Sequence, residues 1–240
     1  MSHIFSIEGN IGSGKSTLVK LLKEKCVNNK NLIFLDEPVD EWTKLTDEHG
    51  KNMIEKFYDN QAKYAFSFQT MAYITRLSKL RKALKSNPHS VIITERSLYT
   101  DKYVFAKMLF EDDKIEMVNY KLYMAWFDEF IQDIPETTFI YIKTNPEVCF
   151  NRIQIRARQG EENIELTYLE KCDQYHNDFI HEMKSKITPN SNFNVHTING
   201  NLDISANLEL LNTMEILSKA GLMQTRCLSN MLSSCGGEHL

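Results

Sequence analysis

Short apolar runs alternate along the chain with longer segments in which apolar residues recur every three or four positions. The apolar runs predict five β-strands, at residues 3–8, 32–36, 91–94, 138–143 and 193–198. The periodic segments predict helices at residues 15–25, 53–86, 99–110, 115–132, 146–158, 165–186 and 203–219. Because the strands are apolar throughout, helices should cover both faces of the sheet. The pattern therefore predicts an α/β fold with a doubly wound, five-stranded parallel sheet.

The same pattern indicates how the chain is organised. Neither a linker nor an internal repeat interrupts it, which favours a single domain over residues 1–220. Periodicity is lost after that, so residues 221–240 are expected to form a peripheral or disordered tail. No segment reaches the roughly 18 uninterrupted apolar residues of a membrane-spanning helix.

Charge and cysteine content narrow the function classes. The formal net charge of −4 argues against a nucleic-acid binder that depends on overall positive charge. The 5 cysteines are scattered without metal-ligand spacing, which is typical of reduced thiols. A glycine-rich motif begins at Gly9 and leaves no room before it for a targeting peptide. We therefore expect a cytoplasmic protein, with the nucleus as an alternative.

Residues 9–16 read GNIGSGKS and match the phosphate-loop motif G-x-x-x-x-G-K-[ST] between a predicted strand and a predicted helix. In such a loop the backbone N–H groups surround phosphates, the lysine reaches the terminal phosphates and the serine hydroxyl can ligate Mg²⁺. The strand–loop–helix context disfavours a chance glycine turn. The predicted ATP-binding residues of this loop are Gly9, Asn10, Ile11, Gly12, Ser13, Gly14, Lys15, Ser16 and Thr17.

A carboxylate stands where a phosphate acceptor would bind. Glu37 follows the second predicted strand, at the edge where open α/β sheets collect their ligands. Pro38 keeps Glu37 out of a helical conformation, so its carboxylate can accept a hydroxyl proton from the acceptor. A solvated loop acid is an equal alternative for this residue alone. Trp42, five residues further, either lines the pocket or belongs to the core.

The long predicted helix carries a face that is suited to a nucleobase. Phe66, Gln69, Ala72, Tyr73 and Arg76 recur at spacings of three and four and so share that face. A glutamine amide can pair with the edge of a base, and aromatic rings can stack on it. For an isolated helix, an aromatic stripe packed in the core would be the favoured interpretation.

Charged residues follow the third strand and close the helix after Pro146. Glu95 can hold Mg²⁺, Arg96 can bridge the reacting oxygens, and a surface ion pair is the alternative. Only 7 of the 28 basic residues are arginine, and three of these, at 152, 156 and 158, fall within seven positions. Arg152, Arg156 and Arg158 predict a lid over the triphosphate, at about residues 152–164.

Taken in order, the phosphate loop, Glu37-Pro38-Val39, F-x-F-Q at 66–69, Glu95-Arg96-Ser97 and R-x-x-x-R-x-R at 152–158 resemble the deoxynucleoside kinase family. The resemblance covers about residues 4–185 and is strongest to the deoxycytidine and deoxyguanosine kinase branch. It implies an ATP- and Mg²⁺-dependent kinase that phosphorylates the 5′-hydroxyl of a deoxynucleoside. It also implies a homodimer, with contacts through the long helices.

The resemblance also implies roles for individual residues. Glu37 would be the general base, and Arg96 would bind near the 5′-oxygen. Gln69 would pair with the base, Tyr58 and Glu161 would hold the 3′-hydroxyl, and Lys15, Ser16 and Glu95 would serve the triphosphate and Mg²⁺. The candidate walls of the base site are Trp42, Phe68 and Phe105. Arg76 and Asp101 are implied to favour purine deoxynucleosides or deoxycytidine over thymidine.

Two departures from the family pattern affect the edge of the site. Residues 61–64 read QAKY where the family often shows a P-E-R-W-like run, and Gly160 interrupts the usually acidic run before Glu161. Two rival functions are a thymidylate-type nucleoside monophosphate kinase and a catalytically silent nucleotide-binding regulatory subunit. The first needs a cation where Glu37 would repel the substrate phosphate, and the second would leave the acid and base groups idle.

Overall fold

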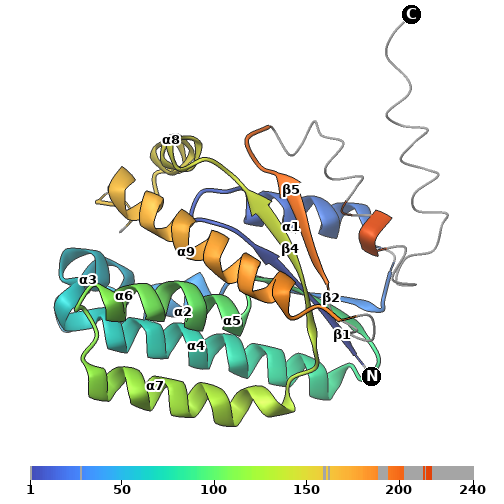
Figure 1. Ribbon diagram of the computed structural model, residues 1–240, viewed down its shortest axis with the longest axis horizontal. Coiled ribbons are helices and arrows are strands. Elements are labelled where there is room, and N and C mark those ends of the chain that lie inside the picture. The colour runs from blue at the N-terminus through green and yellow to red at the C-terminus, as the bar shows by residue number, and fades with distance from the viewer. Residues whose placement is uncertain are drawn as a thin grey trace, which may run out of the picture.

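The computed structural model describes residues 2–27, 29–158, 161, 163–188, 194–202, 213 and 215–217. Within them, five parallel strands form one sheet in the order β2-β3-β1-β4-β5 (Figure 1). The strands are β1 (His3–Glu8), β2 (Leu32–Leu35), β3 (Val91–Glu95), β4 (Thr137–Lys143) and β5 (Val195–Asn199). The predicted α/β class and parallel sheet are confirmed.

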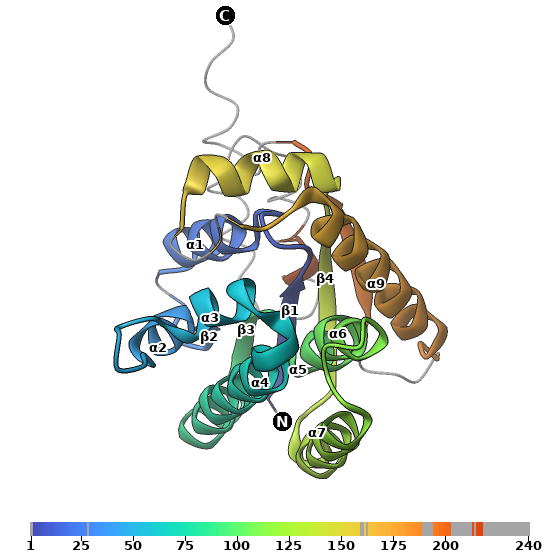
Figure 2. The same cartoon turned by 90° about the vertical axis from the view of Figure 1, so that its left-hand side faces the viewer.

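Alternate strand residues are buried on opposite faces of the sheet, as the period of two in a strand requires. One face packs on α1 (Lys15–Lys25), in a cluster that includes Ile7, Leu18 and Ile93. The other face packs on α4 (Gln61–Ser86) and α9 (Leu166–Ser185), and α7 (Met117–Phe130) lies outside α4. Figure 2 shows α1 on one side of the sheet and α4 and α9 on the other. Both faces are therefore covered, as predicted.

The prediction of one continuous helix over 53–86 is wrong. The structure has α3 (Met53–Asp59) and α4 (Gln61–Ser86), with Asn60 between them at φ −151° and ψ 81°. The Asn60 side chain accepts a hydrogen bond from the Lys63 N–H and so caps α4. Asparagine competes for backbone hydrogen bonds in this way and favours helix ends. The break turns α3 toward the carboxyl edge of the sheet.

The segment predicted as one helix over 99–110 contains a change of helix type. A short α5 (Leu98–Thr100) continues into a π-helical turn, η1 (Asp101–Ala106), and then into α6 (Lys107–Glu111). Single π-helical turns inside α-helices are frequent at functional sites. Here the turn holds Asp101 and Phe105, two residues of the predicted site.

The helix α2 (Val39–Lys44) was not predicted, and the end of the helix predicted over 115–132 is a 3₁₀ turn (Ile131–Asp133). The remaining boundaries differ by a few residues, as at α8 (Pro146–Arg156). The α8 helix ends two residues before the predicted boundary because Ala157 adopts a left-handed conformation, with φ 46°. The helix predicted at 203–219 lies mostly outside the described residues, and the tail at 221–240 lies wholly outside them.

Three cysteines, Cys26, Cys149 and Cys172, are buried and form no disulfide. Cys227 and Cys235 lie outside the described residues. In the part of the chain that the structure describes, no helix combines the length and the apolar character needed to cross a membrane.

The phosphate loop joins β1 to α1 and depends on a glycine at its first position. Gly9 has φ +147°, and a Cβ added there would lie 2.6 Å from Ser13 Oγ and 2.8 Å from the Ile142 carbonyl oxygen. Both contacts are closer than real Cβ atoms show, so a side chain at Gly9 would displace the loop or β4.

We therefore expect Gly9→Ala to weaken ATP binding by roughly tenfold or more, because relieving this overlap must distort the loop. Gly50→Ala is the control, since Gly50 also has a positive φ but an added Cβ there meets no atom within 4 Å. Equilibrium binding of ATP to the two variants checks the prediction. Wild-type affinity in Gly9→Ala would contradict it.

Candidate active site

A cavity of about 480 Å³ opens at the carboxyl edge of the sheet, between the phosphate loop, α3, α4 and the end of α8. The structure brings almost all of the predicted site residues to this one cavity. Those that line it are Ile11, Gly12, Gly14, Lys15, Ser16, Thr17, Glu37, Trp42, Tyr58, Phe68, Gln69, Arg76, Glu95, Arg96, Asp101, Phe105, Arg152, Arg156, Arg158 and Glu161.

Three predicted loop residues support the cavity without lining it. Asn10 accepts a hydrogen bond from Ile11 N–H through its side chain, which also donates to the Leu169 carbonyl. The side chain of Ser13 is buried, and Gly9 makes the close approach described above. These residues fix the shape of the loop against β4 and α9.

Lys15 is buried beside the loop, and its Nζ donates to the Asn10 carbonyl oxygen at 2.7 Å. Burial and, less strongly, the positive charge of Arg96 together lower the pKa of Lys15 to about 7. A bound triphosphate would bring negative charge to the ammonium and favour its protonated form. Lys15 is therefore poised to receive phosphate.

Ser16 and Glu95 meet at the start of α1, where Ser16 Oγ donates to Glu95 Oε1 at 2.7 Å. A hydroxyl and a carboxylate are the hard oxygen donors that Mg²⁺ prefers, so this pair fits the ion. Among the described residues, no group of three or more His, Cys, Asp or Glu side chains could hold a metal. Mg²⁺ held here would take its other ligands from phosphate and water, as is usual for this ion.

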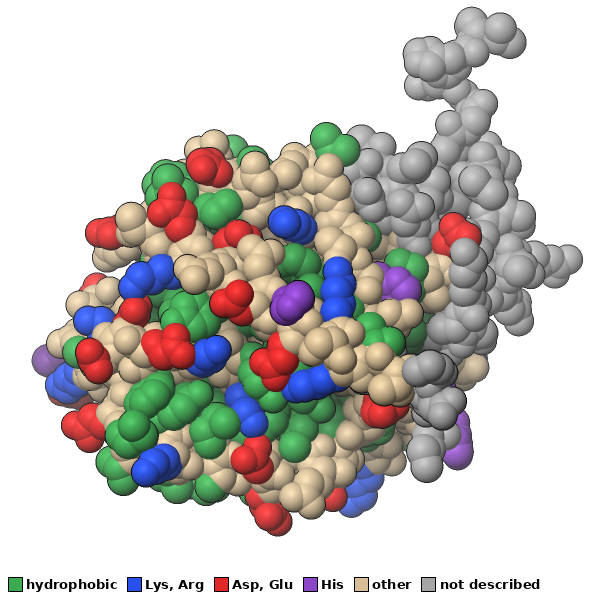
Figure 3. Space-filling view, in the orientation of Figure 1, with side chains coloured by type: hydrophobic (Ala, Val, Ile, Leu, Met, Phe, Trp, Pro, Cys, Tyr) green, Lys and Arg blue, Asp and Glu red, His purple; other side chains and the backbone are tan. Residues whose placement is uncertain are grey.

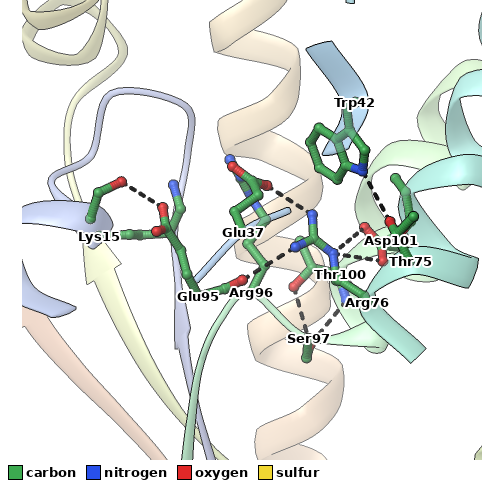
Figure 4. A network of polar contacts seen from close by, with 12 residues as sticks. Lys15, Glu37, Trp42, Thr75, Arg76, Glu95, Arg96, Ser97, Thr100 and Asp101 are labelled. Atoms are coloured by element: carbon green, nitrogen blue, oxygen red, sulfur yellow. Dashed lines mark hydrogen bonds and ion pairs between the residues drawn. The ribbon is translucent and has the colours of Figure 1, made fainter. Parts of the chain in front are cut away.

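Glu37 lies between two arginines on the other side of the cavity (Figure 4). Its Oε1 accepts from Arg76 Nη2 at 2.8 Å and from Arg96 Nη1 at 2.6 Å. Burial raises the pKa of Glu37, but the charges of Arg96, Arg76 and Lys15 outweigh burial and hold it well below its ordinary value. The carboxylate is thus ionised at neutral pH, and no described residue donates a hydrogen bond to its Oε2.

Arg76 is held on its other side by Asp101, which accepts from Arg76 Nε through both carboxylate oxygens, at 3.2 and 3.0 Å. Asp101 is 1% exposed. Burial raises the pKa of Asp101 to about 6, although the charge of Arg76 opposes the change. The Trp42 ring lies 5.4 Å from the Arg76 guanidinium carbon, so Trp42 both lines the cavity and packs on this pair.

The alternative of a surface ion pair for Glu95 and Arg96 is wrong, because both side chains are buried. Arg96 has a left-handed backbone conformation, with φ 63°. Such a conformation costs energy for a residue with a Cβ and clusters at functional sites. The guanidinium carbon of Arg96 lies 5.2 Å from the centre of the Phe105 ring.

The predicted nucleobase face of α4 divides into two. Gln69, Ala72 and Arg76 line the cavity, whereas Phe66 and Tyr73 pack in the core against α7, so their assignment to this face is wrong. The aromatic wall on this helix is the predicted Phe68, which stacks on Phe57 of α3 with ring centres 4.5 Å apart. The alternative interpretation, an aromatic stripe packed in the core, is thus correct for two of the five residues.

Four lining residues were not predicted, namely Val39, Ile54, Phe57 and Tyr168. Phe57 precedes the predicted Tyr58 on α3. Tyr168 lies on α9 and meets Tyr58 edge to face, with ring centres 6.3 Å apart. No local signal in the sequence points to Tyr168, because only tertiary packing brings it there.

The three lid arginines do not act as one group in this structure. Arg156 and Arg158 both pair with the Glu161 carboxylate. Arg152 instead donates to the backbone carbonyls of Gly200, at 2.8 Å, and Leu202, at 3.2 Å. All three still line the cavity, while residues 159, 160 and 162 of the predicted lid lie outside the described residues.

Tyr58 faces the same end of the cavity as Glu161. Burial raises the pKa of the Tyr58 hydroxyl well above its ordinary value, and the negative charge of Glu161 raises it further. Tyr58 is therefore a neutral hydroxyl beside a carboxylate that is held by two arginines. Such a pair offers both a donor and acceptors to a hydroxyl of a ligand.

The parallel sheet, the phosphate loop between β1 and α1, and the adjoining pocket define a P-loop kinase fold. The sequence profile of the deoxynucleoside kinase family matches residues 5–215. Human deoxycytidine kinase is 33% identical over 195 residues, which cover 73% of this chain and 74% of that protein. A probable deoxycytidine kinase of fowlpox virus is 36% identical over 180 residues, covering 74% and 71%. The mitochondrial deoxyguanosine kinase of Xenopus laevis is 30% identical over 201 residues, covering 76% and 75%.

The chain therefore belongs to the deoxynucleoside kinase family, whose members are ATP-dependent phosphotransferases. The resemblance drawn from its motifs is confirmed.

The Arg76–Asp101 pair should make substrate binding depend on pH. Because the pKa of Asp101 is raised to about 6, its charge is present above pH 6 and is lost as the pH falls through that value. Arg76 then loses a partner, so the KM for the deoxynucleoside should rise by roughly tenfold at pH 5. Steady-state kinetics from pH 5 to 8 measure this inflection, and it should disappear in Asp101→Asn. The same profile in both proteins would exclude Asp101 as its source.

Proposed function

We propose that this protein transfers the γ-phosphoryl group of ATP–Mg²⁺ to the 5′-hydroxyl of a deoxynucleoside and releases the 5′-monophosphate, a step of nucleotide salvage. One observation carries the proposal. An ionised carboxylate, Glu37, has one oxygen fixed by two arginines in the same cavity that Lys15 and Ser16 line. A neutral sugar hydroxyl can approach such a carboxylate, whereas a second phosphate would be repelled.

Glu37 would contribute to the reaction mainly by orienting the attacking hydroxyl, and less by its basicity. With a depressed pKa it attracts a proton weakly. In phosphoryl transfer, however, the transition state is loose, and the nucleophile needs orientation above all. Glu37 Oε2 would accept the hydrogen bond of the 5′-hydroxyl and take the proton as the new P–O bond forms.

The cations of the site would neutralise the charge that moves with the phosphoryl group. Arg96 would lie beside the attacking oxygen, and Lys15 would hold the terminal phosphates. Arg156 and Arg158 would leave Glu161 in part and reach toward the triphosphate. Mg²⁺ held by Ser16 and Glu95 would supply further neutralisation of the phosphate oxygens.

The pocket supports a preference for purine deoxynucleosides or deoxycytidine over thymidine. Gln69 is 2% exposed and lines the cavity together with Phe68, so it can pair with a base that stacks on that ring. The Arg76–Asp101 pair lines the same cavity and would crowd a thymine methyl group. Relatives of this chain are named as deoxycytidine and deoxyguanosine kinases, which agrees with this preference.

A thymidylate-type kinase is the less suitable assignment. It would need a free cation in the acceptor pocket for the phosphate of its substrate. Within the described part of the chain, Arg76 and Arg96 are the cations that pair with Glu37, so both are already engaged. A silent regulatory subunit would make no use of the Ser16–Glu95 and Glu37–Arg96 pairs.

The Glu37→Gln variant should still bind the deoxynucleoside, but its turnover should fall by about 10²- to 10⁴-fold. The amide oxygen can still accept from the arginines, whereas it cannot take the proton. Asp36→Asn is the matched control, because Asp36 is the exposed neighbouring carboxylate and pairs with Lys23. Turnover of the four natural deoxynucleosides and of their monophosphates, with ATP as donor, provides the measurement. Retained turnover in Glu37→Gln would remove Glu37 from the role of base.

We further propose a homodimer formed through α7. This helix exposes Met117, Val118, Leu122 and Trp126, and α4 adds Ile74. Figure 3 shows hydrophobic side chains gathered along the lower edge of the molecule, over α7. A contiguous apolar patch of this kind is typical of a protein interface, and a second copy would present the same self-complementary surface.

Leu122→Glu combined with Trp126→Glu should convert the dimer to a monomer, because two buried charges would face each other across the two-fold axis. Light scattering after size-exclusion chromatography measures the mass. Leu45→Glu is the control, since Leu45 is exposed on the chain after α2, away from this patch. A monomeric wild-type protein, or a double variant that stays dimeric, would contradict this interface.

Two further expectations remain proposals: a single domain over residues 1–220 and a cytoplasmic location. The buried cysteines Cys26, Cys149 and Cys172 form no disulfide, which agrees with a reducing compartment.

A further inference from the structure

Glu8 is a fully buried carboxylate that the proposed reaction does not use. It ends β1, directly before the first glycine of the phosphate loop, and its side chain does not line the cavity. Ser6 Oγ donates to Glu8 Oε1 at 2.6 Å, within the same strand. Burying a carboxylate costs free energy unless its oxygens are hydrogen-bonded, so the partners of Glu8 show what its position achieves.

The second oxygen of this carboxylate reaches a different part of the chain. Glu8 Oε2 accepts a hydrogen bond from Thr100 Oγ1, and Thr100 is also fully buried. Thr100 N–H in turn donates to Ser97 Oγ at 3.2 Å, and the two hydroxyl oxygens lie 3.3 Å apart. Figure 4 shows Ser97 and Thr100 just below the Arg76–Asp101 pair.

Thr100 stands at the centre of the segment that forms the acceptor side of the cavity. Arg96, with its left-handed backbone, directly precedes Ser97. Asp101 directly follows Thr100 and begins the π-helical turn η1, which also carries Phe105. Arg96, Asp101 and Phe105 therefore all belong to the backbone that the Thr100 hydroxyl fixes.

We propose that Glu8 is a positioning residue: its hydrogen bond to Thr100 ties the strand that ends in the phosphate loop to the segment that orients the acceptor. The inference rests on the proposed function, because it concerns the distance between the donor phosphate and the acceptor hydroxyl. Transfer requires the reacting atoms to lie about 3–3.5 Å apart, and a misplacement of about 1 Å costs on the order of 10²-fold in rate. A buried, directional contact between the two halves of the site sets that distance.

The variant that tests this role is Thr100→Val, which keeps the shape of the side chain and removes its hydroxyl. We expect kcat to fall roughly tenfold or more, while KM for ATP and for the deoxynucleoside each change by no more than about twofold. Each substrate meets its own intact half-site, and only the relation between the two half-sites is lost. Thr100→Ser restores the hydroxyl and should restore kcat.

Ser6→Ala is the matched control, because it removes the other hydrogen bond of the same carboxylate without touching the acceptor segment. Its thermal stability should fall, but its kcat should stay within about twofold of the wild-type value. A folded Thr100→Val with wild-type kcat, or equal losses of kcat in Thr100→Val and Ser6→Ala, would overturn the proposal. If Thr100→Val does not fold, Thr100→Ala decides by the same criteria.

Failure of this inference is distinguishable from failure of the proposed function. A wild-type protein that phosphorylates no deoxynucleoside would refute the proposed function. An active wild-type protein whose kcat does not depend on the Thr100 hydroxyl would refute only the role of Glu8.

Discussion

The active site depends on one shared contact, in which a single carboxylate oxygen of Glu37 accepts hydrogen bonds from both Arg76 and Arg96. Two guanidinium groups buried side by side would repel each other without an anion between them. Glu37 provides that anion, and Asp101 balances the far side of Arg76. The arrangement keeps the carboxylate ionised and leaves its other oxygen without a donor among the described residues. A neutral hydroxyl is the ligand that such an oxygen suits.

The fold brings this contact within reach of a phosphate site because parallel strands end at a common edge. Glu37 follows β2, Arg96 follows β3, and the phosphate loop follows β1, which lies beside β3 in the sheet. Each charged group therefore needs only a short loop to reach the cavity. The π-helical turn after β3 then aims Asp101 back at Arg76. The order of the strands alone thus sets the acceptor pocket next to the triphosphate pocket.

Most of the sheet and the site were predictable because their signals are local. The phosphate loop is a contiguous motif, and Glu37 and Arg96 come one and two residues after apolar runs that predict strands. The break at Asn60, the π-helical turn and the inward packing of Phe66 and Tyr73 were not predictable in this way. The π-helical turn and the packing of Phe66 and Tyr73 depend on tertiary contacts, whereas the break at Asn60 is a local cap inside an otherwise continuous helical period. Arg152 likewise does not join the other lid arginines, because its guanidinium donates hydrogen bonds to backbone carbonyls that follow β5.

The proposed reaction places Glu37 opposite a sugar alcohol and across from a triphosphate held by the phosphate loop. A crystal structure of the protein with ADP, Mg²⁺ and a deoxynucleoside would show this geometry. We expect the 5′-oxygen to lie within about 2.6–3.2 Å of a Glu37 carboxylate oxygen and to point toward the β-phosphate. A nucleoside bound with its 5′-oxygen turned away from Glu37, or bound outside this cavity, would refute the role of Glu37.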